Sequence, residues 1–154
     1  MSFFLKASKR IQTSRLILRF PTIEDATSIT HMINNPKIAS MTGTIPHPYS
    51  DSIALDWIYR VTTQRHDGSN LAYLICHQKS TKVIGVISLR LLNTEQLNLG
   101  YWLGEPYWGS GFCTEAGHAL IEMVKLHTDL PIVAKHLVEN QPSKKVLIRL
   151  GLFS

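Results

Sequence analysis

The stretch from Leu97 to Ala116 reads LNLGYWLGEPYWGSGFCTEA, and it changes from one periodicity to another at a glycine turn. Its first part, residues 97–103, is an apolar and aromatic run typical of a strand. Its last part, from Thr114 on, indicates a helix with an apolar stripe formed by Ala116, Leu120, Met123 and Val124. Gly109-Ser110-Gly111 lies between the two.

This glycine turn predicts a phosphate cradle. A helix start offers unpaired backbone N–H groups and a partial positive charge, and glycines let the chain approach a phosphate closely. The turn is no Walker loop, because no Gly-Lys-Ser/Thr follows it, and no Rossmann fingerprint, because the sheet before it is expected to be antiparallel. On its own, a GxG turn also suits a tight connection from strand to helix.

The N-terminal third predicts a strand and two helices. Residues 14–20 alternate and end at Pro21, as expected of a strand with one solvated face. Thr22 can cap a helix that stops near residues 34–36, and Glu24 and Asp25 in its first turn suit the helix dipole. Ser50 or Ser52 can cap a second helix, which runs toward Asp67-Gly68.

The rest of the chain completes an α/β pattern. Runs 71–76, 83–89 and 97–103 predict an antiparallel meander, and residues 132–134 a further strand. Gln141 to Leu150 predicts a last helix, with Gly151 as its stop. We therefore expect a single domain, residues 1–154, with a mixed sheet and helices on both faces.

Composition sets further expectations. The formal net charge is +5, but the basic residues are scattered, so direct nucleic-acid binding is not expected. No apolar run approaches a membrane span, and a cytoplasmic location is the default expectation. Cys76 and Cys113 are expected to be free thiols, and the histidines lack the spacing of metal ligands, so no metal is expected.

Three separated motifs resemble the GNAT acetyltransferases, in the branch of the ribosomal-protein N-terminal acetyltransferases. They are residues 99–103 with 107–116, Asn140-Gln141-Pro142-Ser143, and residues 146–151, and the resemblance extends back to the SRLILR start at Ser14. The resemblance implies acetyl-CoA as co-substrate and a splay between the fourth and fifth strands that admits its pantetheine arm. The implied cofactor-binding residues are Trp102, Leu103, Trp108, Gly109, Ser110, Gly111, Phe112, Cys113, Thr114, Asn140 and Ser143.

The resemblance also implies roles at the reacting group. Asn140 would hydrogen-bond the pantetheine arm, and Ser143 would lie near the thiol as a candidate acid. Backbone N–H groups near Trp102 and Leu103 would polarise the thioester carbonyl. The plainer interpretations are a helix cap for Asn140 and a first-turn polar residue for Ser143.

The general base is the departure from the family pattern. Many relatives carry a glutamate where this chain has Asn98, and an amide cannot take a proton at neutral pH. Glu95 in the preceding turn, acting directly or through a water, and His136 on the fifth strand are the candidates. Each also has a structural interpretation, and proximity to the thioester can suffice without a base.

The C-terminal residues also differ from the pattern. Relatives continue past this point into a β-hairpin, which is expected to be missing here and would leave an exposed strand edge. A homodimer that covers the edge, an open groove, or a weakened enzyme are the possible outcomes.

Two functions follow. The first is an acetyl-CoA-dependent N-acyltransferase that acts on a primary amine, either a protein N-terminus or a small molecule, by direct attack in a ternary complex. The alternative is a truncated, catalytically weak relative that binds acetyl-CoA as a sensor. Acceptor contacts are expected from loops such as residues 41–49.

Overall fold

The computed structural model describes residues 3–34 and 49–134. One six-stranded sheet has the order β1-β2-β3-β4-β5-β6; its neighbours are antiparallel except for the parallel pair β5 and β6. The strands are β1 (Arg10–Gln12), β2 (Leu16–Arg19), β3 (Asn70–His77), β4 (Val83–Leu92), β5 (Gln96–Leu103) and β6 (Ile132–Ala134). The mixed, mostly antiparallel sheet and its central meander are confirmed.

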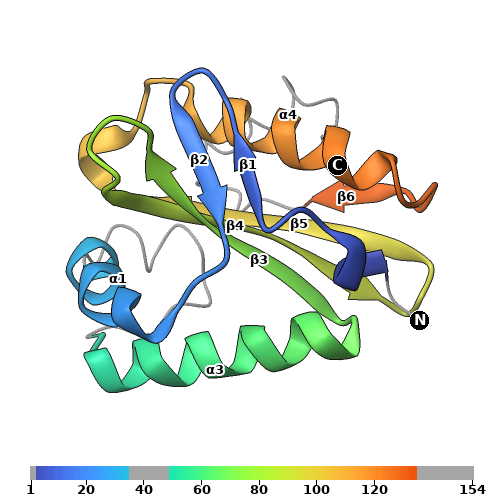
Figure 1. Ribbon diagram of the computed structural model, residues 1–154, viewed down its shortest axis with the longest axis horizontal. Helices are drawn as coiled ribbons and strands as arrows, with labels where there is room; N and C mark the ends of the chain where they lie inside the picture. The colour runs from blue at the N-terminus through green and yellow to red at the C-terminus, as the bar shows by residue number, and fades with distance from the viewer. Residues whose placement is uncertain (1–2, 35–48, 135–154) are drawn as a thin grey trace.

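Helices cover both faces of this sheet, as expected (Figure 1). The α-helices are α1 (Ala26–Ile33), α3 (Asp51–Asp67) and α4 (Phe112–Lys125), and the 3₁₀ turns are η1 (Phe3–Lys6), η2 (Ile23–Asp25) and η3 (Glu105–Tyr107). The apolar stripe of α4 packs against one face of the sheet, in a cluster with Tyr73, Leu97 and Leu99. α1 and α3 cover the opposite face, against Leu74 and Val86.

The expectation of a solvated face on β2 is wrong. Leu16 and Leu18 are buried in the cluster beneath α4, and Ile17 is buried in the cluster beneath α1 and α3. β2 pairs with β1 and β3, so it lies inside the sheet with a helix layer on each side. A strand covered on both faces has no solvated side.

The predicted helix signals are confirmed at α3. The Ser50 hydroxyl accepts a hydrogen bond from the Ile53 N–H at 3.3 Å, and Gly68 ends the helix with a φ of 85°. Both features satisfy backbone groups that a helix end leaves unpaired. α4 begins at Phe112, earlier than the expected Thr114, with Gly111 as its N-cap.

The parallel pair β5 and β6 lies at one end of the strand order. Leu97, Asn98 and Leu99, in the first half of β5, pair with Ile132, Val133 and Ala134. The expected splay, the last helix 141–150 and the question of a C-terminal hairpin concern residues outside the described part of the chain. Among the described residues, no helix is long and apolar enough to cross a membrane, and no His, Cys, Asp and Glu group could hold a metal ion.

Candidate functional site

The glycine turn lies between η3 and α4, and its backbone conformation explains why residues 109 and 111 are glycines. Gly109 has a φ of 81° and Gly111 a φ of 79°, both in the left-handed region. A Cβ added to Gly109 would meet nothing within 4 Å, and one added to Gly111 would lie 3.7 Å from Arg15 Nη2, an ordinary contact. Glycine is therefore required at these positions by backbone conformation and not by lack of space.

This conformation leaves a series of backbone donors unpaired. Within the described part of the chain, the N–H groups from Gly109 to Thr114 find no acceptor. The first intrahelical bond of α4 joins the Glu115 N–H to the Gly111 carbonyl at 3.0 Å. Successive N–H groups at left-handed turns form concave anion sites, and the positive end of the helix dipole adds to the field. The geometry therefore suits a phosphate.

The predicted cofactor-binding side chains around this turn divide by burial. Phe112 and Cys113 point into the core beneath α4, and burial raises the pKa of the Cys113 thiol to about 12. These two residues could therefore contact a ligand only through their backbone N–H groups, while Gly109 and Ser110 are exposed. The Thr114 hydroxyl is buried, and no described residue hydrogen-bonds it.

Trp108 joins the turn to the end of β5. Its indole Nε1 donates to the Leu103 carbonyl at 2.7 Å, and its ring packs at the margin of both core clusters. This contact fixes where the chain leaves the strand and enters the turn. Trp108 is thus placed as a structural support of the predicted cradle.

The two N–H groups expected to polarise a carbonyl point in opposite directions. The Gly104 N–H donates to the Ile84 carbonyl on β4 at 2.8 Å. Donors alternate along an antiparallel strand, so the Trp102 N–H also points toward β4, where Trp102 is paired with Val86. The Leu103 N–H points to the other edge of β5, the edge on which β6 pairs. Of the two, the Leu103 N–H is the one directed to that edge.

Arg15 and Glu115 form a pair that the sequence did not reveal and that holds the turn in place; we call this pair the brace. Arg15, in the connection between β1 and β2, donates from Nη1 to the Ser110 carbonyl at 2.9 Å and from Nε to Glu115 at 2.7 Å. Its guanidinium carbon lies 4.3 Å from the centroid of the Phe112 ring. Figure 1 shows the β1 and β2 connection at the same end of the molecule as the start of α4.

Glu115 completes the brace from the first turn of α4. Its carboxylate also accepts from the Thr13 hydroxyl and from the Arg15 backbone N–H. Partial burial raises the pKa of Glu115, but hydrogen bonds from Thr13 and Arg15 outweigh this and leave the pKa below its ordinary value. Glu115 is therefore ionised at neutral pH and ties two distant segments together.

The candidate catalytic residues are not brought together in the described part of the chain. Glu95 is exposed in the turn before β5, at the opposite end of that strand from Leu103. At about 3.3 Å per residue, the two positions lie roughly 25 Å apart. Residues 136, 140 and 143, which are His136, Asn140 and Ser143, lie outside the described residues.

Asn98, the residue at the position where many relatives carry a glutamate, lies on β5. It alternates with the buried Leu97 and Leu99, so it faces the side of α1 and α3.

Comparison with known proteins decides the family. The acetyltransferase (GNAT) domain model matches residues 15–152. The chain belongs to the GNAT acetyltransferase family. A relative, an uncharacterised N-acetyltransferase named p20 from Bacillus licheniformis, is 30% identical over 141 residues, covering 89% of this chain and 78% of that protein.

Solved structures share the GNAT fold with this chain. One is RimL, described as a ribosomal L7/L12 alpha-N-protein acetyltransferase, in complex with coenzyme A; the TM-score is 0.83 at 22% identity, over 92% of this chain and 82% of that one. Another is the microcin C7 self-immunity acetyltransferase MccE with acetyl-CoA and AMP; its TM-score is 0.78 at 24% identity, over 90% of this chain and 79% of that one.

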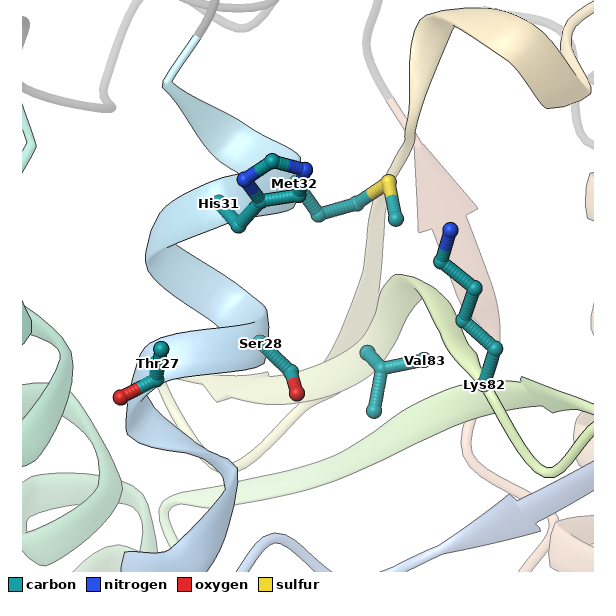
Figure 2. Close-up of a pocket in the computed structure, with 6 residues that line it drawn as sticks. All are labelled: Thr27, Ser28, His31, Met32, Lys82 and Val83. Atoms are coloured by element: carbon teal, nitrogen blue, oxygen red, sulfur yellow. The ribbon is translucent and has the colours of Figure 1, made fainter.

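A pocket of about 260 Å³ lies near the end of β5 in this GNAT domain, on the face of α1. Figure 2 shows Thr27, Ser28, His31 and Met32 of α1 on one side and Lys82 and Val83 on the other. A Cβ on Gly104 would overlap the sulfur of Met32, so this pocket adjoins the point where the chain leaves β5. It is separate from the N–H row at the start of α4.

Proposed function

We propose that this GNAT domain transfers an acetyl group from acetyl-CoA to a primary amine, on a protein N-terminus or a small molecule. The observation that carries the proposal is the row of unpaired N–H groups from Gly109 to Thr114 at the start of α4. A pyrophosphate presents several anionic oxygens, and these donors match them without a bound metal. The shared fold with RimL supports a protein N-terminus as one acceptor class.

The residues at the end of β5 suggest the course of the rest of the co-substrate. With the pyrophosphate on the turn, the pantetheine arm would follow the β5 edge toward which the Leu103 N–H points. That N–H would then polarise the thioester carbonyl. Asn140 and Ser143 keep their proposed roles on the arm and at the thiol.

We propose that the transfer proceeds by direct attack in a ternary complex. The amine lone pair attacks the thioester carbonyl carbon, the C–S bond breaks, and the sulfur leaves with a proton as free coenzyme A. Ser143 is the candidate donor of that proton. His136 and Glu95 are the candidate bases for the proton of the amine, and the exposed position of Glu95 at the far end of β5 favours His136.

We propose that the acceptor binds on the face of α1 and α3. Asn98 and Gly100 point to this face, and the Cβ of an alanine at Gly100 would lie 3.7 Å from the Ser88 hydroxyl. Ser88 is half-buried and Arg90 is exposed, so β4 and β5 carry polar residues on this face, in contrast to the apolar face beneath α4. Such polar residues suit the hydrated, charged surroundings of an amine substrate.

A thiol-release assay with acetyl-CoA and a panel of amines tests the proposal. The panel contains ribosomal-protein N-terminal peptides, polyamines and aminoglycosides, and calorimetric titration of acetyl-CoA accompanies it. We expect saturable acetyl-CoA binding and thiol release with at least one amine. Binding without turnover across the panel would favour the alternative, a catalytically weak acetyl-CoA sensor. Absence of binding would overturn both.

A further inference from the structure

We infer that Arg15 is a cofactor-binding residue, whose guanidinium lies at the edge of the glycine turn and selects ligands that carry a pyrophosphate. The inference rests on the proposed binding of acetyl-CoA at this turn. Arg15 comes from the connection between β1 and β2, far from the turn in sequence, and reaches it through the folded sheet.

Three contacts fix the guanidinium in place. Nε pairs with Glu115, Nη1 donates to the Ser110 carbonyl, and the plane lies over the Phe112 ring. Ser110 and Phe112 flank Gly111, so Arg15 touches both neighbours of the left-handed N-cap. A guanidinium held by a carboxylate, a carbonyl and an aromatic face loses little further freedom when it binds a ligand.

Nη2 remains for a ligand. No described residue accepts a hydrogen bond from it, and it lies 3.7 Å from where a Cβ on Gly111 would be. The Arg15 side chain is 43% exposed, against 18% for Glu115, so the cation faces solvent at the edge of the N–H row and the carboxylate lies behind it. An arginine donor beside backbone N–H groups strengthens the binding of phosphate oxygens.

A purely structural brace and a cofactor-binding residue differ in one measurable respect. The ratio of the affinities for acetyl-CoA and for S-acetyl-pantetheine, which has the thioester arm and no pyrophosphate, reports binding at the turn. If Arg15 only holds the turn, Arg15→Gln and Arg15→Lys lower this ratio equally, because both lose the planar fork that contacts Ser110 and Glu115. If the guanidinium also contacts the pyrophosphate, Arg15→Lys keeps part of the ratio, because it retains the cation.

The experiment measures that ratio by calorimetry for the wild-type chain, Arg15→Gln, Arg15→Lys and Arg10→Gln. Arg10 is exposed on β1 of the same hairpin, so Arg10→Gln removes the same charge away from the turn. We expect Arg15→Gln to lower the preference for acetyl-CoA by about tenfold, since a charge-assisted hydrogen bond is lost. Arg15→Lys keeps part of the preference, and Arg10→Gln leaves it unchanged.

The outcomes separate this inference from the proposed function. If the wild-type chain does not prefer acetyl-CoA to S-acetyl-pantetheine, the phosphate cradle itself is wrong. If the wild-type chain shows the preference and Arg15→Gln keeps it, or if Arg15→Gln and Arg15→Lys lower it equally, the role of Arg15 in ligand binding is overturned. Should Arg15→Gln not fold, as its melting curve would show, Arg15→Lys carries the test, because it retains the cation and loses the planar fork.

Discussion

At the residue scale, two glycines share a left-handed backbone conformation, but only one of them lies in the proposed phosphate site. Substituting each of them distinguishes the cost of backbone strain from an effect on binding. Gly109 in the turn has a φ of 81°, and Gly68 at the end of α3 has a φ of 85°. An alanine at either position pays about 1–2 kcal/mol for the left-handed conformation. Gly68 is the matched control, because it caps a helix away from the predicted phosphate site.

Gly109→Ala is therefore expected to lower acetyl-CoA affinity by about tenfold, because the strained turn no longer presents its N–H groups together. Gly68→Ala is expected to lower the melting temperature to a similar extent and leave the affinity unchanged. Thermal melting and calorimetry on both variants check this. Equal affinities for the two variants would argue against a role of the turn in binding.

At the scale of elements, the entry to α1 depends on one buried carboxylate. Asp25 is 7% exposed and accepts hydrogen bonds from Arg19 at 2.8 and 2.9 Å and from the Thr22 N–H at 2.8 Å. Burial raises the pKa of Asp25, but the hydrogen bonds from Arg19 and Thr22 outweigh it, and the pKa lies below its ordinary 3.8. A carboxyl with a lowered pKa stabilises the fold above its unfolded pKa, and this contribution is lost as the pH falls through the folded value.

Asp25→Asn is accordingly expected to reduce the free energy of unfolding by about 1–3 kcal/mol at neutral pH, because Arg19 loses its charged partner. The difference from the wild-type chain should shrink as the pH falls below about 4 and on through the lowered folded pKa, at which the wild-type carboxylate is itself protonated. Urea unfolding at several pH values measures this, with exposed Glu24→Gln as control. A difference that stays constant with pH would contradict the assigned role.

The sequence predicted features that depend on neighbouring residues, but it did not predict contacts between residues that are distant in the chain. Ser50, Gly68 and the glycine turn act on their own neighbours, so short patterns predicted α3 correctly and placed the start of α4 two residues late, at Thr114 instead of Phe112. Arg15 and Glu115 are distant in sequence and meet through the sheet, and no periodicity reports such a pair. The burial of Ile17 likewise depends on helices that pack on β2 from elsewhere in the chain.

At the scale of the whole molecule, we propose that the two faces of the sheet serve different substrates. The co-substrate would bind on the side of α4, while the polar residues Ser88, Asn98 and Gly100 face the side of α1 and α3, where the acceptor would bind. A transferase needs such a division, because two substrates must approach one carbonyl from different directions.

The homodimer expected from the sequence stays a prediction, since it concerns residues after β6. Light scattering at micromolar concentration would check it.

The central claim is that the N–H groups from Gly109 to Thr114 hold the pyrophosphate of acetyl-CoA, and amide NMR tests it most directly in a chain of 17.4 kDa. On titration with acetyl-CoA, the amide signals of these residues should shift and saturate together, while that of Gly68 stays in place. S-acetyl-pantetheine should shift them much less. Saturable binding with shifts confined to other residues would contradict the account.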